Sequence, residues 1–227
     1  MSHYGISFDY RASDERFESA LLEAKHRAVV LSDYPSKNFD SRQLEQIASR
    51  VREGMGLLMI GGWGSFYGVD GAYTETVLQE VLPVKMQSSD DRINCSQPCL
   101  VERNCAHPIV EGLPFDTACA SIGGYNRVTT KPGALEVLSA CRFSVRREAS
   151  GYAFAPYQKA EPLLVVGSFG KGRVVAFTSD VAPHWVGGLV DWGDSRVNAC
   201  ADGAGPVEVG DCYARFFFQM ICWTANL

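Results

Sequence analysis

The segment Asp40–Ser65, DSRQLEQIASRVREGMGLLMIGGWGS, decides the fold. Asp40 and the glutamine three residues later form a capping box, and the apolar residues that follow recur at helical spacing up to Gly54. Directly afterwards, Leu57–Ile60 is apolar at every position, which is typical of a parallel strand covered on both faces. The segment therefore predicts a helix that leads into a buried strand, which ends at the glycine-rich loop Gly61–Ser65.

A second apolar run, Ala28–Leu31, lies before this helix and stops at the polar residues that precede Pro35. Strand, helix and strand in this order predict a parallel crossover. Upstream, apolar residues at helical spacing predict a helix over Asp14–Lys25. Downstream, Thr74 is expected to cap a short helix that Pro83 ends, and the weak pattern over residues 85–108 predicts irregular structure.

The C-terminal third shows two further patterns. Two β-rich runs, Pro162–Gly167 and Gly172–Phe177, flank a glycine-bracketed turn and predict a hairpin; the turn lacks the residues of a phosphate-binding loop. Aromatic and aliphatic residues at helical spacing predict a last amphipathic helix over Tyr213–Ile221. Together the patterns predict one α/β domain over residues 1–227, with a mostly parallel central sheet and a C-terminal hairpin.

Composition excludes several functions. The 227 residues are 46% hydrophobic and 21% charged, which is typical of a globular protein, and the net charge of −5 argues against nucleic-acid binding. No apolar run approaches the roughly 18 residues of a membrane span, and Met1–Gly5 shows no export signal, so we expect a cytoplasmic protein without a membrane partner. In that compartment the eight cysteines are expected to be reduced.

Several segments together resemble a known family. The chain is similar to the uncharacterised glutamine-amidotransferase-like family, a relative of class I amidotransferases and of trehalose-utilisation-type proteins. The resemblance runs from about Val29 to the C-terminus and implies a flavodoxin-like three-layer α/β/α sandwich. The segments that carry it are Leu31–Pro35, Gly56–Phe66, Ala106–Pro114, Gly123–Arg127 and Gly170–Trp185.

Two departures from that family matter. Its catalytic members present a cysteine nucleophile at a sharp elbow after the strand equivalent to Leu57–Ile60, but Gly61 and Gly62 occupy the elbow here. The resemblance therefore implies an amidotransferase-like protein whose glutaminase nucleophile is missing. The fold also normally starts with a strand and a helix before the predicted Asp14–Lys25 helix, so we expect an abbreviated N-terminus whose sheet edge is either exposed or covered by a partner chain, as in a homo-oligomer.

Candidate site residues follow the carboxyl ends of the predicted strands, where open α/β sheets bind ligands. Asp180 and His184 are candidates for acid–base catalysis, and His184 matches the family's general base by position. Trp63 offers a stacking surface, and Ser65, with the neighbouring carboxylate, amide and guanidinium groups, offers hydrogen bonds. The full set of candidate ligand-binding residues is Asp33, Gly61, Gly62, Trp63, Ser65, Asn126, Arg127 and Trp185.

We expect no cofactor and no metal. Cys95, Cys99, Cys105 and His107 offer four zinc ligands, but their spacing lacks the paired short knuckles of structural zinc sites. Cys200 and Cys212 are weak candidates for a displaced nucleophile, because nothing near them in the sequence lowers a thiol pKa.

Three functions stay open at this point. The first is binding of a small polar ligand at the strand-end crevice without catalysis. The second is a hydrolase or isomerase that uses Asp180 and His184 as its acid–base pair, and the third is a structural or assembly subunit. Each candidate residue also has a structural interpretation, since aspartate caps loops and a buried histidine or tryptophan serves packing.

Overall fold

The computed structural model describes residues 1–157, 159–200 and 205–227. Its α-helices are α1 (Ala20–Glu23), α2 (Ser41–Glu53), α3 (Leu78–Val81), α4 (Pro183–Val186) and α5 (Asp211–Ala225). Its strands are β1 (Ala28–Ser32), β2 (Gly56–Ile60), β3 (Val84–Met86), β4 (Arg92–Arg103), β5 (Ser121–Asn126), β6 (Val128–Thr130), β7 (Leu135–Glu148), β8 (Gly151–Pro156), β9 (Glu161–Phe169), β10 (Gly172–Phe177), β11 (Arg196–Ala199) and β12 (Val207–Gly210). None of the described helices is long and apolar enough to cross a membrane.

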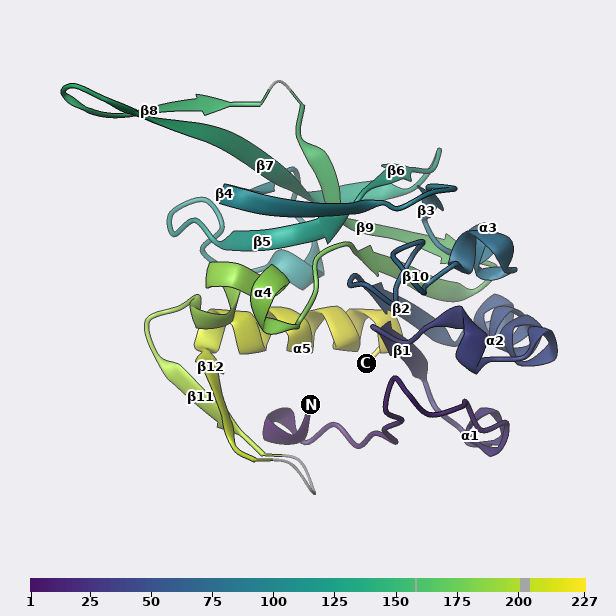
Figure 1. Cartoon of the computed structure of the whole chain (residues 1–227). Helices are drawn as coiled ribbons and strands as arrows, with labels where there is room; N and C mark the ends of the chain where they lie inside the picture. Colours follow the sequence, from purple (N-terminus) through teal and green to yellow (C-terminus); the bar gives the residue numbers. More distant parts are fainter. Residues whose placement is uncertain (158, 201–204) are drawn as a thin grey trace.

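Eight of the described strands build the central sheet, and β3–β6 and β11–β12 form two separate two-stranded sheets (Figure 1). Its order is β1-β2-β10-β9-β7-β4-β5, and β8 pairs only with β7. The pairs β1–β2 and β2–β10 are parallel, and all the others in this sheet are antiparallel. This corrects the prediction of a mostly parallel sheet within the predicted α/β class, because tight turns such as that between β9 and β10 can join only antiparallel neighbours.

Two apolar cores lie on opposite faces of the sheet. Leu58 and Ile60 of β2 belong to the core that contains Phe216 of α5, whereas Leu57 and Met59 belong to the core that contains α2. All five residues of β2 are buried. Since successive side chains of a strand point to opposite faces, this division confirms the three-layer sandwich, with α5 on one face and α2 on the other (Figure 1).

The local patterns for the central elements are confirmed. The carboxylate of Asp40 accepts a hydrogen bond from the Gln43 amide at 2.8 Å, and the Gln43 side chain accepts one from the Asp40 amide at 2.9 Å, so the capping box of α2 is complete. The hairpin β9–β10 and the last helix, α5, also form as predicted. The prediction of one domain without the family's first strand stays a prediction; β1 ends the sheet on that side.

Two helix predictions are wrong in extent. Only Ala20–Glu23 of the predicted Asp14–Lys25 helix is helical, because the amide of Phe17 donates instead to the Asn38 carbonyl at 3.0 Å. Thr74 does not cap α3: its hydroxyl donates to the Gln87 carbonyl, and α3 begins after Val77 with no side-chain cap. In both cases a contact distant in sequence takes the group that the local pattern assigned to a helix.

The predicted irregular region also contains a long strand. β4 pairs with β5 on one side and with β7 on the other. A register shift between Asn94 and Cys99 interrupts its pairing with β5. A bulge of this kind breaks the period-two alternation of apolar residues, which is why the pattern was weak.

Candidate functional site

The glycine elbow, Gly61 and Gly62, follows β2 directly. The amide of Gly61 donates to the Phe177 carbonyl at 2.7 Å, and a Cβ atom at this position would lie 2.0 Å from the Thr178 carbonyl oxygen. Gly62 has a φ of +142°, and a Cβ atom there would lie 2.3 Å from a carboxylate oxygen of Asp33. Neither residue therefore leaves room for a side chain, and the elbow cannot carry a cysteine in this geometry.

Asp33 and Ser65 join the loops that follow β1 and β2. Asp33 has a φ of +49°, its carboxylate accepts a hydrogen bond from the Gly64 amide at 2.6 Å, and its own amide donates to the Ser65 hydroxyl at 3.1 Å. Ser65 is buried. The Ser65 hydroxyl, a predicted ligand contact, thus links the loop after β2 to the loop after β1. Asp33 orients the backbone of the elbow loop through its hydrogen bond with Gly64.

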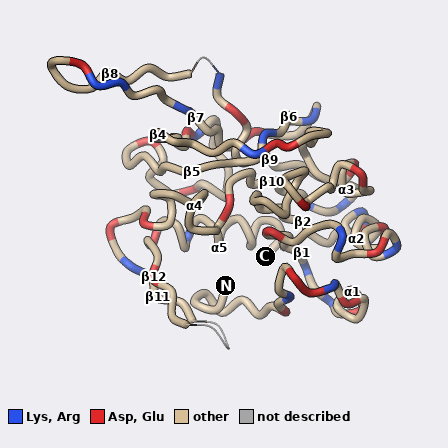
Figure 2. Tube along the Cα trace, viewed as in Figure 1, with Lys and Arg blue, Asp and Glu red and all other residues tan. Residues whose placement is uncertain are grey.

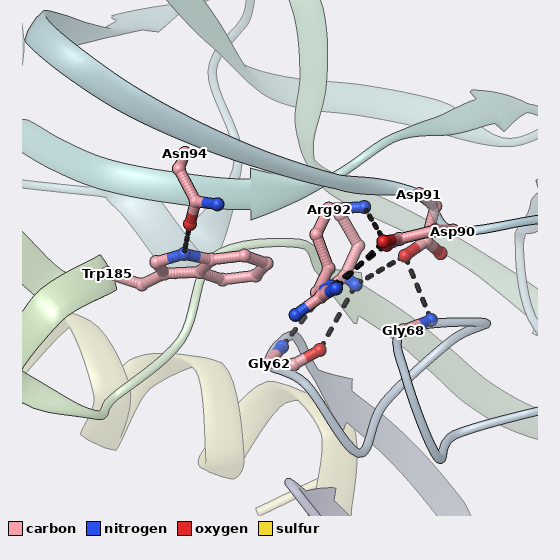
Figure 3. A network of polar contacts seen from close by, with 8 residues as sticks. Gly62, Gly68, Asp90, Asp91, Arg92, Asn94 and Trp185 are labelled. Atoms are coloured by element: carbon pink, nitrogen blue, oxygen red, sulfur yellow. Dashed lines mark hydrogen bonds and ion pairs between the residues drawn. The ribbon is translucent and has the colours of Figure 1, made fainter.

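A second network of hydrogen bonds, centred on Asn126 and Asp91, also holds the elbow in place (Figure 3). Asn126 is fully buried; its side chain accepts from the Gly62 amide at 2.8 Å and donates to the Gly62 carbonyl at 3.1 Å and to Asp91 at 2.8 Å. The Asp91 carboxylate also accepts from the amides of Tyr67 and Gly68, both at 3.0 Å. Asn126 therefore positions the elbow, and Asp91, which no sequence motif indicates, anchors Asn126.

Asp180 lies beyond the end of β10 and is 1% exposed. Its Oδ1 atom accepts a hydrogen bond from the Val181 amide at 2.6 Å, whereas its buried Oδ2 atom has no hydrogen-bond partner among the described residues. Burial raises the pKa of Asp180 and the nearby Asp33 carboxylate raises it further, whereas the backbone amides of Ala182 and Val181 and the charge of His184 lower it. The structure thus brings together Asp33, Asp180 and His184.

His184 lies close enough to Asp180 for their charges to interact, but the described residues show no direct hydrogen bond between the two side chains. The imidazole belongs to α4 and is exposed. Its ring packs edge-to-face on Trp63, with centroids 5.7 Å apart. His184 therefore acts on Asp180 through charge and on Trp63 through contact.

Trp63 is the accessible aromatic side chain of the site, with 46% of its surface exposed. The guanidinium of Arg92 lies 4.5 Å from its ring centroid, a cation–π contact. Asp90 accepts two side-chain hydrogen bonds from Arg92, at 2.9 and 2.8 Å, and these bonds lower the pKa of Asp90 to about 2. Trp63 is thus held between a fixed cation and an imidazole while its ring stays accessible.

The two remaining candidate residues, Trp185 and Arg127, each have a partner within the protein. Trp185 is fully buried, and its indole N–H donates to Asn94 at 2.7 Å (Figure 3), so its ring offers no face to a ligand. Arg127 forms an ion pair with Glu161 at 3.4 Å. Its backbone amide donates to the Asp91 carbonyl at 2.7 Å, which ties this residue to the anchoring network.

The four possible zinc ligands, Cys95, Cys99, Cys105 and His107, do not come together as a set. Among the described residues, no group of three or more histidine, cysteine or acidic side chains is arranged to hold a metal ion. Cys95 and Cys99 contact each other, which lowers the pKa of Cys95 and raises that of Cys99. His107 instead accepts a hydrogen bond from the Ile109 amide and packs against Trp223. No disulfide bond joins cysteines within the described part of the chain.

Two surface cavities lie elsewhere. One, of about 260 Å³, is lined by residues such as Arg27, Arg50 and Asn226, and the other, of about 450 Å³, by residues such as Gln79 and Thr129. Neither is lined by a candidate site residue. The candidate site is therefore defined by its residues at the strand ends and by their contacts.

The two cores on opposite faces of the sheet define the chain as an α/β sandwich. A family model described as "Putative glutamine amidotransferase" matches residues 28–198, so the chain belongs to this glutamine-amidotransferase-like family. No curated protein matches the chain.

Several solved structures are also similar to this chain. Cytoplasmic protein STM1381 of Salmonella typhimurium LT2 is 34% identical with a TM-score of 0.60, and the match covers 76% of this chain and 69% of that one. Cytoplasmic protein STM3548 of Salmonella typhimurium is 31% identical with a TM-score of 0.58, and the match covers 79% and 68%. A "thua-like" protein of Parabacteroides merdae is 15% identical with a TM-score of 0.47 over 74% and 63% of the two chains.

Proposed function

We propose that this chain is a cytoplasmic amidotransferase-like protein that binds a small polar ligand beside Trp63, Asp33 and Asp180 and does not hydrolyse glutamine through a thiol. The compartment follows the two Salmonella relatives, which are cytoplasmic proteins. The loss of thiol chemistry rests on the elbow, because a Cβ atom at Gly61 or Gly62 would overlap neighbouring oxygen atoms.

One observation carries the binding proposal: Asp180 is buried but leaves its Oδ2 atom without a partner among the described residues. A buried acceptor of this kind costs free energy unless a donor meets it. A ligand that carries a hydroxyl or ammonium group supplies such a donor once the carboxylate rotates toward the surface. The exposed ring of Trp63 would then cover the apolar face of the same ligand.

The test is a thermal-shift screen of the full chain against sugars, polyols, carboxylates and nucleotides, followed by calorimetry on the hits. We expect a donor-rich compound to raise the melting temperature. Trp63→Ala and Asp180→Asn should each weaken its binding at least about tenfold, because each removes a direct contact. Tyr10→Ala is the matched control, since Tyr10 is an exposed aromatic residue outside the site.

Two results would refute the binding proposal. One is a screen in which no compound shifts the melting temperature beyond scatter. The other is a ligand whose affinity is the same for the wild type, Trp63→Ala and Asp180→Asn.

The thiol part of the proposal has its own test. Ammonia release from glutamine should stay at background for the wild type and for a variant in which all eight cysteines are replaced. Release that is present in the wild type and lost in the variant would show that a thiol reaches the substrate by another route.

Acid–base catalysis by Asp180 and His184 is the second candidate, favoured by the raised pKa of Asp180. A carboxyl group that stays protonated to higher pH can donate a proton to a substrate, and the exposed imidazole of His184 can accept one. His184→Ala separates the two candidates: loss of turnover with retained ligand affinity supports catalysis, whereas a protein that only binds has no turnover to lose.

A further inference from the structure

The β7–β8 hairpin extends beyond the central sheet as a two-stranded arm (Figure 1). The last residue of β7 that pairs with β4 is Arg142, and the last that pairs with β9 is Ala140. From Phe143 to Glu148, β7 pairs only with β8. Six residue pairs at about 3.3 Å per residue give an arm of about 20 Å.

The root of the arm is fixed to the body. The side chain of Gln97 accepts a hydrogen bond from the Val145 amide at 2.7 Å, which replaces the strand pairing that β4 no longer provides. Tyr157 donates its amide to the Arg142 carbonyl at 2.9 Å, and the Arg142 guanidinium stacks over the Tyr157 ring at 4.7 Å. The arm therefore has a defined direction.

The two faces of the arm differ in composition. Paired residues of an antiparallel ribbon share a face, and so do residues two apart along a strand. The register places on one face the residues Phe143, Val145, Arg147, Tyr152, Phe154 and Pro156. The opposite face carries Ser144, Arg146, Glu148, Gly151, Ala153 and Ala155.

The aromatic face is uncovered. Tyr152 is 68% exposed and Phe154 is 65% exposed, and neither belongs to the two apolar cores of the described chain. An isolated two-stranded hairpin is marginally stable in water, and clustered exposed aromatic residues are typical of an association surface. The arm thus has the composition of a surface that another molecule covers.

The charge of the arm indicates which kind of surface it can pack against. Residues 142–157 contain three arginines and a single acidic residue, Glu148, although the whole chain carries a net charge of −5. In Figure 2 basic segments and one acidic segment lie along the arm, and both signs of charge occur over the body; by count the chain outside the arm has 18 basic and 25 acidic residues, a net charge of −7. Two arms packed on each other would bring like charges together, whereas the arm and the body of a second copy carry opposite charges.

We propose that the aromatic face of the β7–β8 arm docks on the acidic body of a second copy of this chain, and that the two copies exchange arms around a twofold axis. A symmetric exchange uses the arm twice, so its small area is doubled in the interface. Arg147 lies on the aromatic face and meets the acidic surface of the partner, while Arg146 lies on the outer face. This interface does not depend on the proposed ligand site.

The test measures self-association of the full chain by sedimentation velocity from about 1 to 100 µM, a range that spans typical dimer affinities. We expect a dimer for the wild type. Tyr152→Ser with Phe154→Ser should raise the dissociation constant at least about 100-fold, because both aromatic residues lose their contact. The matched control, Ala153→Ser with Ala155→Ser, alters the opposite face of the same strand and should leave the constant within about threefold.

A second pair of variants tests the charge argument. Arg147→Glu should raise the dissociation constant at least about tenfold, and Arg146→Glu should change it far less. Far-UV circular dichroism and the melting temperature verify that each variant is folded. The proposal is overturned by a monomeric wild type at 100 µM, by equal effects of the two faces, or by a tighter dimer in Arg147→Glu, which is the result that arm-on-arm packing gives.

Discussion

Asp91 and Asp180 are two buried aspartates near the same elbow, but their surroundings differ. Asp91 is 3% exposed and its carboxylate accepts hydrogen bonds from Asn126, Tyr67 and Gly68. Asp180 is 1% exposed, and its Oδ2 atom has no partner in the described part of the chain. Burial raises the pKa of both. A fully satisfied carboxylate serves the fold, and an unsatisfied one is a candidate for binding.

Both networks surround the glycine elbow, and a substitution there is expected to lower the free energy of unfolding the most. Gly61→Ala should lower the free energy of unfolding by at least about 3 kcal/mol, because the new methyl group overlaps the Thr178 carbonyl and forces β2 and β10 apart. Urea denaturation measures the loss. Gly205→Ala is the matched control, since nothing lies within 4 Å of a Cβ atom there. Equal stabilities for the two variants would show that the strand ends can separate freely.

The second-largest loss of stability is expected at Asp91, whose carboxylate is fully hydrogen-bonded. Asp91→Asn should cost about 2 kcal/mol, because the new amide nitrogen replaces one carboxylate oxygen and leaves one backbone N–H, that of Tyr67 or of Gly68, without its acceptor. The neighbouring Asp90→Asn removes an exposed ion pair with Arg92 and should cost less than about 1 kcal/mol. Denaturation of both variants in one buffer gives the comparison. A smaller loss for Asp91→Asn than for Asp90→Asn would contradict the anchoring role of Asp91.

Asp180→Asn should have the smallest effect on stability, and that effect should depend on pH. Because the folded-state pKa of Asp180 is raised, ionisation costs the folded protein more than the unfolded chain, so wild-type stability falls as pH rises through the folded value. Asp33, His184 and Tyr213 also interact with its charge. The neutral variant escapes this cost, and its stability relative to wild type should increase from about pH 4 toward neutrality. A difference that is constant with pH would be evidence against a raised pKa.

Local signals predicted the elements that depend on local contacts. The capping box of α2, the fully apolar β2 and the glycine turn of the β9–β10 hairpin each lie within a few residues of sequence. By contrast, Phe17 bonds to Asn38, and β4 changes register between Asn94 and Cys99. These features arise from partners distant in sequence, and a single sequence carries no signal for them.

The sequence indicated which residues lie near one another at the strand ends, and their role as a site stays a prediction. Asp33, Asp180, His184 and Trp63 do meet, because the carboxyl ends of β1, β2 and β10 lie side by side in the parallel part of the sheet. Trp185 and Ser65 are buried, which a residue type alone does not reveal. Asp91 was missed because it lies in the polar run Ser88–Arg92, and its partner Asn126 is 35 residues away.

The crowding at Gly61 also limits how this scaffold can be engineered. Glutaminase activity could not be introduced by the substitution Gly61→Cys alone, because the backbone oxygen of Thr178 occupies the volume that the new side chain needs. A designer would first have to reshape the turn after β10, and only then add the reactive sulfur.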